Sequence, residues 1–186
     1  RGLVKRAVIL APKSVLRQWQ EELYEKFALN VPLYNGKEFV DYWEQIQPIT
    51  TANPWDGVEL ALASSQLLKR QDRQDELLNA APWDLVLVDE AHHARRKDFL
   101  DQRTYRPNRL LELLRGLQAR TQSLLLMTAT PMQVDPIEVW DLLTLLGLSG
   151  EWGADGRNFL RFYTELRSQE PDWDFVFRMV QAEREA

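Results

Sequence analysis

The sequence of 186 residues contains no cysteine and no long hydrophobic run. The absence of cysteine excludes disulfide scaffolds, cysteine nucleophiles and zinc–thiolate sites, and it fits a reducing compartment, so we expect a cytoplasmic protein. The longest uninterrupted apolar run, Ala7–Ala11, is far shorter than the roughly 18 residues that a membrane-spanning helix needs. We therefore expect no membrane partner.

Histidine is scarce as well. The two histidines, His92 and His93, are adjacent in the sequence. Adjacent side chains point to different sides of the chain, whereas a zinc site needs spaced ligands such as His-Glu-x-x-His. This arrangement excludes a histidine-based zinc site.

An excess of positive charge is also missing. The chain has 23 Lys and Arg against 28 Asp and Glu, a net charge of −5. Modules dedicated to nucleic acids are usually basic, so any nucleic-acid contact here would need a local patch. The densest basic stretch comprises Arg95, Arg96, Lys97, Arg103, Arg106 and Arg109. That stretch is compatible with a DNA-contacting loop and equally with a solvated face.

A phosphate-binding loop of the form Gly-x-x-x-x-Gly-Lys-Ser/Thr is absent too. In such a loop the glycines let backbone N–H groups surround the phosphates, and the lysine reaches their outer oxygens. The one Gly-Lys pair, Gly36-Lys37, is followed by Glu38, and Val31 stands where the first glycine would be. This sequence therefore lacks the loop that usually binds the phosphates of a nucleotide.

The residues that are present predict an α/β fold. Four short apolar runs read as buried strands: Ala7–Ala11, Val58–Ser64, Leu85–Asp89 and Ser123–Thr128. They alternate with helical patterns, and their nearly continuous hydrophobicity is typical of parallel strands covered on both faces. We predict a parallel sheet flanked by helices.

Three helices between these strands have recognisable signals. Ser14 can cap a helix whose apolar stripe runs from Leu16 to Phe27. The aromatic and apolar spacing over residues 39–46 predicts a second, short helix, and Asn108 can cap a leucine-rich third.

The C-terminal part is also expected to be helical. Asp135, followed by a proline and two residues later by a glutamate, marks the start of a helix that Gly147 ends. A loop is expected over residues 149–156, followed by two helical patterns. We accordingly expect a helical extension over residues 148–186 beyond a main unit of residues 1–147.

One strand delivers two carboxylates at its end. The apolar run Leu85–Val88 leads directly into Asp89 and Glu90. In open α/β sheets ligands bind beyond the carboxyl ends of the strands. A carboxylate can hold Mg²⁺ through water while its neighbour deprotonates an attacking water, which suits a magnesium nucleotide. The alternative is an ordinary acidic turn at a strand end.

Three blocks in a fixed order narrow this choice. They are residues 11–19 (Ala-Pro-Lys-Ser-Val-Leu-Arg-Gln-Trp), 89–92 (Asp-Glu-Ala-His) and 128–133 (Thr-Ala-Thr-Pro-Met-Gln). With these blocks the chain resembles superfamily-two helicase-like ATPases of the Swi/Snf type, whose motifs Ia, II and III they match. The resemblance covers roughly residues 3–147 and implies an N-terminal RecA-like lobe.

The resemblance also implies roles for these residues, with ATP and Mg²⁺ as cofactors. Asp89 would hold the metal through water, and Glu90 would be the hydrolytic base. His92 would link the nucleotide site to Thr128 and Thr130 in the third block.

Double-stranded DNA is the partner that the resemblance implies, through contacts of Pro12, Lys13 and Ser14 with the nucleic-acid backbone. Ser64 and Ser65 occupy the place of a further nucleic-acid motif, although taken alone they read as ordinary structural serines.

In the family, a phosphate-loop strand precedes motif Ia and a second RecA-like lobe follows. Because this sequence contains neither, we expect the 186 residues alone to hydrolyse no ATP. The strand over residues 123–128 should then have an exposed edge, through which copies of the chain can associate.

Residues 105–111 and 132–140 additionally resemble bacterial helicase-like proteins of phage defence, of the DISARM type. Two other functions stay open from the residues alone. One is a RecA-like scaffold without ATP hydrolysis, and the other is an unrelated metal-dependent hydrolase that uses Asp89 and Glu90.

Overall fold

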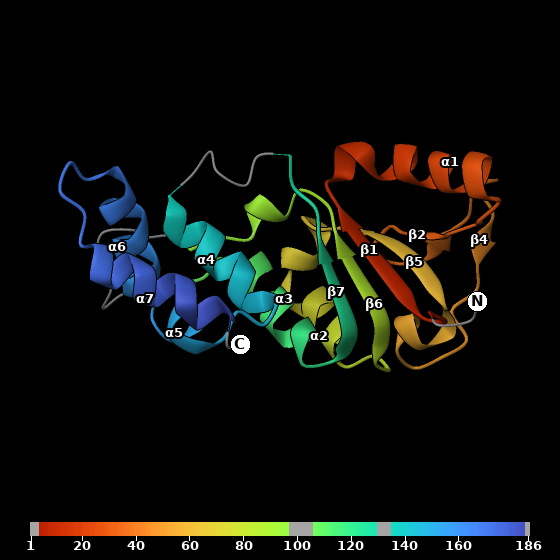
Figure 1. The fold of residues 1–186 in the computed structure, drawn as a ribbon. Coiled ribbons are helices and arrows are strands. Elements are labelled where there is room, and N and C mark those ends of the chain that lie inside the picture. The colour runs from red at the N-terminus through yellow and green to blue at the C-terminus, as the bar shows by residue number, and fades with distance from the viewer. Residues whose placement is uncertain (1–3, 97–105, 130–134, 185–186) are drawn as a thin grey trace.

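Short apolar segments pair into a sheet of seven strands, in the order β4-β3-β2-β5-β1-β6-β7 (Figure 1). This computed structural model describes residues 4–96, 106–129 and 135–184. The strands are β1 (Ala7–Ala11), β2 (Leu33–Tyr34), β3 (Phe39–Val40), β4 (Ile46–Gln47), β5 (Leu60–Ser64), β6 (Trp83–Val88) and β7 (Thr121–Leu126). Strands β2, β5, β1, β6 and β7 run parallel, whereas β3 and β4 are antiparallel additions at one edge. The predicted α/β sheet is confirmed, but it is mixed and not purely parallel.

Alternation along β1 separates two apolar layers. Val8 and Leu10 face the larger core, which includes leucines of α2 (Gln71–Leu78), α3 (Arg109–Gln118) and α4 (Pro136–Leu145). Ile9 and Ala11 point to the other face and pack with α1 (Leu16–Phe27). Because successive strand residues point to opposite faces, a single strand can bind helices on both sides of the sheet.

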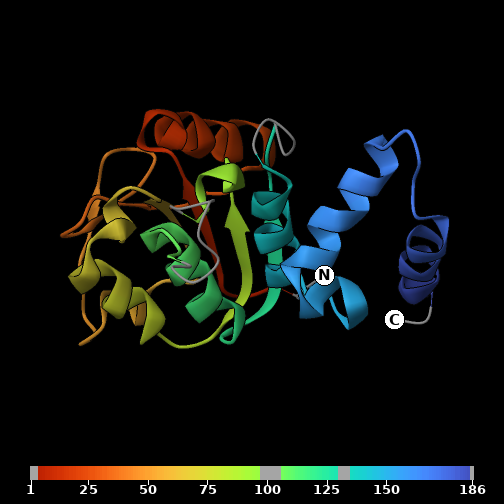
Figure 2. The same cartoon turned by 90° about the vertical axis from the view of Figure 1, so that its left-hand side faces the viewer.

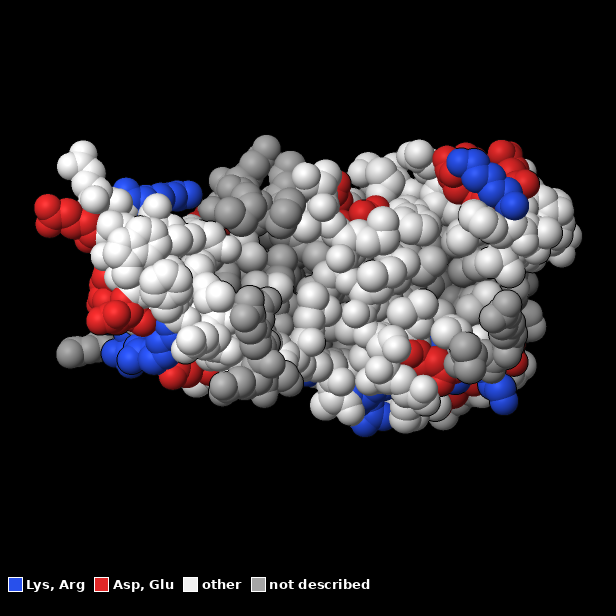
Figure 3. All heavy atoms as spheres, in the orientation of Figure 1, with Lys and Arg blue, Asp and Glu red and all other residues white. Residues whose placement is uncertain are grey.

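Helix α1 covers only part of its face of the sheet. It packs on residues of β1, β5 and β2, and Figure 1 shows it above these strands and away from β7. In β7, Leu124 and Leu126 contact the larger core, while Leu125 points the other way and is 47% exposed. The middle of this face, over β7, is almost free of charged side chains (Figure 3). The predicted exposed edge at this strand is confirmed, since β7 ends the sheet among the described residues.

The C-terminal helices form a second layer beyond α4, as Figure 2 shows. They are α5 (Gly150–Ala154), α6 (Gly156–Arg167) and α7 (Trp173–Arg184), and α6 packs on α4. Trp140 of α4 donates a hydrogen bond to the carbonyl of Trp152 at 2.7 Å. The helices expected in the C-terminal part are confirmed. The loop expected over residues 149–156 is wrong, because these residues contain α5. Among the described residues, no helix has the length and apolar character to cross a membrane.

Two of the predicted helix starts are confirmed by side-chain caps. Asn108 accepts a hydrogen bond from the backbone N–H of Leu111 at 2.9 Å, and Asp135 accepts one from Ile137 at 3.0 Å. Ser14 was wrongly predicted to cap α1: it lies inside a 3₁₀ turn, Lys13–Val15, and its side chain makes no cap hydrogen bond.

The helix predicted over residues 39–46 was also wrong, because this segment forms the hairpin β3–β4. The carboxylate of Asp41 accepts hydrogen bonds from the backbone N–H groups of Trp43 and Gln45, at 2.9 and 2.8 Å. This side chain closes the turn by taking N–H groups that a helix would need.

Candidate functional site

Three of the predicted motifs meet at the carboxyl edge of the parallel strands. The backbone N–H of Asp89, after β6, donates to the carbonyl of Leu10 in β1 at 2.8 Å. The N–H of Ser65, after β5, donates to the carbonyl of Ala11 at 2.9 Å. The residues that follow β1, β5 and β6 are therefore held side by side by sheet hydrogen bonds that continue past the strand ends.

Asp89 lines a pocket of about 420 Å³ between this edge and α1. One carboxylate oxygen accepts the N–H of Glu90 at 2.9 Å, and the other accepts the indole N–H of Trp19 at 2.9 Å. No group of three or more potential metal ligands occurs among the described residues. One carboxylate suits Mg²⁺, which keeps most of its waters and takes further ligands from nucleotide phosphates.

Glu90 adopts a backbone conformation that is uncommon for a residue with a side chain. Its φ is 52° and its ψ is 46°, in the left-handed region. A non-glycine residue there costs about 1 kcal/mol or more, and such residues concentrate at functional sites. The sharp bend turns the chain from β6 into the Ala91–His93 turn and directs the carboxylate of Glu90 toward His92.

His92 links the acidic pair to the segment after β7. Its Nδ1 lies 3.1 Å from the Oε2 of Glu90 and 3.1 Å from the Oγ1 of Thr128. The backbone also connects the two segments, because the N–H of Ala91 donates to the carbonyl of Met127 at 2.9 Å. Thr130, the other predicted threonine, lies outside the described residues.

Pro12, Lys13 and Ser14 stand at the end of β1, and Lys13 and Ser14 are exposed. Ser64 and Ser65 are only 5% and 3% exposed. Lys13 and Ser14 are thus open to solvent, whereas the two later serines are packed inside.

Gln66 connects these two groups and was missed by the sequence analysis. Its Oε1 accepts the backbone N–H of Lys13 and the hydroxyl of Ser64, both at 2.8 Å. Neither its residue type nor its spacing distinguishes this glutamine in the sequence, since the two donors come from different strand ends.

The basic stretch is not one surface. Arg96 makes two hydrogen bonds of 2.8 Å to the carboxylate of Asp141 in α4, and Asp141 is fully buried. Arg95, Arg106 and Arg109 are exposed, while Lys97 and Arg103 lie outside the described residues. Arg96 therefore joins the end of the acidic motif to α4, a role that the run of basic residues in the sequence did not suggest.

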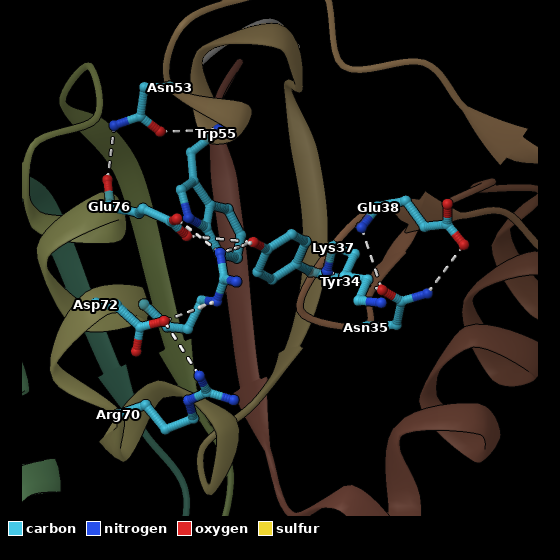
Figure 4. Close-up of polar contacts among 10 residues, drawn as sticks. Tyr34, Asn35, Lys37, Glu38, Asn53, Trp55, Arg70, Asp72 and Glu76 are labelled. Atoms are coloured by element: carbon cyan, nitrogen blue, oxygen red, sulfur yellow. Dashed lines mark hydrogen bonds and ion pairs between the residues drawn. The ribbon is translucent and has the colours of Figure 1, made fainter.

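A second charged cluster lies between β2 and α2, and Figure 4 shows it. The hydroxyl of Tyr34 is 3.2 Å from Glu76 and 3.1 Å from Arg73. Burial, and after it the charge of Glu76, raises the pKa of Tyr34. The Asn53 amide donates to the carbonyl of Glu76 at 2.7 Å, so this cluster fastens α2 to the sheet. Its contacts involve none of the predicted site residues.

Glu138 in α4 is buried, and neither carboxylate oxygen has a hydrogen-bond partner among the described residues. Burial raises its pKa, an effect that Asp135 and Asp141 strengthen and Arg95 and Arg96 oppose. A raised pKa in the folded state means that ionisation of Glu138 opposes folding.

Relative to the wild type, Glu138→Gln is therefore expected to gain stability as the pH rises from the unfolded-state pKa of Glu138 to its folded-state pKa, because the variant has no ionisation that opposes folding. The gain should shrink as the pH falls and be absent below the unfolded-state pKa, where both states bind the proton. Urea unfolding between pH 4 and pH 8 measures it. Asp84→Asn is a control with the opposite sign. Hydrogen bonds from the backbone N–H groups of Arg6 and Lys5 lower the pKa of Asp84, so loss of this carboxylate should destabilise the folded protein at neutral pH. A constant effect of Glu138→Gln across this range would contradict the prediction.

Known proteins resemble this chain in sequence. Residues 1–154 match the family model of the SNF2-related domain. The RNA polymerase-associated protein RapA of Stutzerimonas stutzeri is 34% identical over 134 residues, which cover 72% of this chain and 13% of that protein. RapA of Photobacterium profundum is 28% identical over 98% of this chain and 17% of its own length.

A solved structure shares the fold. The Sulfolobus solfataricus SWI2/SNF2 ATPase core in complex with double-stranded DNA matches with a TM-score of 0.59 and 19% identity. The match covers 91% of this chain and 30% of that one. The chain thus spans less than a third of that structure and less than a fifth of these two RapA relatives.

Proposed function

Because the chain belongs to the SNF2-related domain family, we propose that it is the N-terminal RecA-like lobe of an ATP-driven translocase on double-stranded DNA. One observation carries the proposal: the acidic pair and the exposed Lys13–Ser14 turn lie together at the carboxyl ends of neighbouring strands. The N–H of Asp89 donates to the carbonyl of Leu10, which lies in β1 shortly before the turn. The duplex in the Sulfolobus complex and the association of RapA with RNA polymerase support a role on DNA.

In this proposal each residue at the nucleotide side has one task. Mg²⁺, when bound, neutralises phosphate charge, and Asp89 would hold it through water. Glu90 would take the proton of the attacking water, with its carboxylate oriented by His92. His92 would couple the nucleotide state of the site to Thr128, and we propose the same coupling for Thr130.

At the DNA side, Lys13 and Ser14 would donate to phosphate oxygens, with Pro12 fixing the start of the turn. The burial of Ser64 and Ser65 changes their proposed part from direct contact to support. Ser64 holds Gln66, and Gln66 holds the backbone of Lys13.

The proposal assigns residues 1–147 to the lobe and 148–186 to its helical extension, in a cytoplasmic protein. It also implies partners. A phosphate loop and a second RecA-like lobe of the parent chain would complete the ATP site. In the family the second lobe supplies arginine fingers to the γ-phosphate, and these alone contribute around 10³–10⁵ in rate. The open edge of β7 is the place where another strand, or a second copy of the chain, would pair. Membership of the phage-defence group stays a prediction.

The test is steady-state ATP hydrolysis by the full-length protein, with duplex DNA, single-stranded DNA or duplex RNA added. Stimulation by duplex DNA above the other two is expected, and the 186 residues alone should show no turnover with any of them. Movement is measured separately, by displacement of a triplex-forming strand from the duplex.

A folded full-length protein that hydrolyses no ATP would favour the second function, a RecA-like scaffold.

A further inference from the structure

The side chain of Trp19 connects α1 with the acidic end of β6. Trp19 lies one helical turn after the Lys13–Val15 segment, and its Nε1 donates to the Oδ2 of Asp89 at 2.9 Å. The N–H of Glu90 donates to the Oδ1 of the same carboxylate, also at 2.9 Å. Both oxygens of Asp89 therefore have a donor, which fixes the rotation of the carboxylate and leaves lone pairs free for a metal-bound water.

Packing holds the indole in this position. Trp19 is half-buried and, with Val15 and Leu23, packs against the smaller apolar core beneath α1. The same three side chains and Asp89 line the 420 Å³ pocket. The indole is thus a rigid donor that links α1 to the carboxylate of Asp89. Hydrogen bonds to an ionised acceptor are stronger than those between neutral groups.

We propose that Trp19 is a positioning residue for Mg²⁺: it sets the orientation of Asp89 and joins α1 to the metal site. This inference rests on the proposed function, in which Asp89 serves the metal. Mg²⁺ demands near-ideal octahedral geometry, so its affinity depends on how its ligands are oriented. Loss of a group that orients a metal ligand typically costs 10–100-fold in metal affinity or activity.

The test compares Trp19→Phe with Trp152→Phe in the full-length protein. Both variants remove one indole donor, but that of Trp152 serves the carbonyl of Met179, at 2.7 Å, in the C-terminal helices. In Trp19→Phe the Mg²⁺ concentration that gives half-maximal ATP hydrolysis should rise about 10-fold or more. Turnover at saturating Mg²⁺ and the affinity for duplex DNA should change little. In Trp152→Phe the Mg²⁺ requirement should stay that of the wild type.

A second readout is independent of activity. In protein labelled with fluorotryptophan, the ¹⁹F resonance that Trp19→Phe removes should shift when Asp89 is changed to alanine, and that of Trp152 should not. An active protein in which Trp19→Phe and Trp152→Phe need the same Mg²⁺, or a Trp19 resonance that ignores Asp89→Ala, would overturn the inference. A folded wild type without turnover would instead refute the proposed function. In that case the response of the Trp19 resonance to Asp89→Ala would still test the contact between Trp19 and Asp89.

Discussion

Asp141→Ala is expected to lower the free energy of unfolding by about 3–5 kcal/mol. The carboxylate of Asp141 is fully buried and takes two hydrogen bonds from Arg96, and Arg115 lies 3.6 Å away. Removing it takes away both of the short hydrogen bonds that Arg96, whose side chain is only 13% exposed, makes to a buried carboxylate. Chemical denaturation monitored by tryptophan fluorescence measures the loss.

Two further variants make this result specific. Glu21→Ala removes a carboxylate from the exposed pair with Arg17 and should cost about 0.5 kcal/mol or less. The double change Arg96→Met and Asp141→Leu replaces the buried pair with apolar side chains and should recover much of the stability that Asp141→Ala loses. Equal losses in Asp141→Ala and Glu21→Ala would show that the buried pair contributes no more than a surface pair.

Glu90→Gln should lower ATP turnover by the full-length protein about 10²–10⁴-fold, the usual contribution of a general base. Glutamine preserves the size of the side chain and the left-handed backbone at this position, so the folded structure should persist. It cannot accept a proton from water. Turnover under saturating ATP, Mg²⁺ and duplex DNA measures the effect.

Glu22→Gln is the matched control, because Glu22 lines the same pocket as Asp89 but pairs with Lys26 on the outside of α1. Its turnover should stay within about 2-fold of the wild type. Nucleotide binding by Glu90→Gln should also be retained, since Asp89 is unchanged. Turnover in Glu90→Gln close to that of Glu22→Gln would remove Glu90 from the role of base.

Local signals explain why part of the structure was predictable. The apolar run before Asp89 is typical of a buried strand, and β6 indeed ends at Val88, directly before the acidic pair. Helices α3 and α4 begin at side chains, Asn108 and Asp135, that bind N–H groups two or three residues away. In each case the residues that determine the structure are neighbours in the sequence, so a short window contains them.

The wrong and the missing predictions have two causes: two local signals compete, or the contact joins residues that are far apart in the sequence. Residues 39–46 have the apolar spacing of a helix, but the side chain of Asp41 takes the N–H groups of the turn. The hydrogen bond from Trp19 to Asp89 spans 70 residues, and that from Arg96 to Asp141 spans 45. Trp19 ends the first of the three family blocks, but nothing in that block identifies Asp89 as its partner, and no local pattern singles out Asp141. Only the folded sheet brings each pair together.

The shared hydrogen bonds at the carboxyl ends of the parallel strands tie three strand ends into one unit. Asp89 bonds to Leu10, and Ser65 bonds to Ala11, so the ends of β6, β1 and β5 form one continuous backbone network. A displacement of one end relative to the next would break these bonds, which makes the edge a stiff platform and not a lever. In the proposed translocase, a power stroke would therefore have to move this platform as a unit against another body, and DNA bound at Lys13–Ser14 would move with it by the same distance.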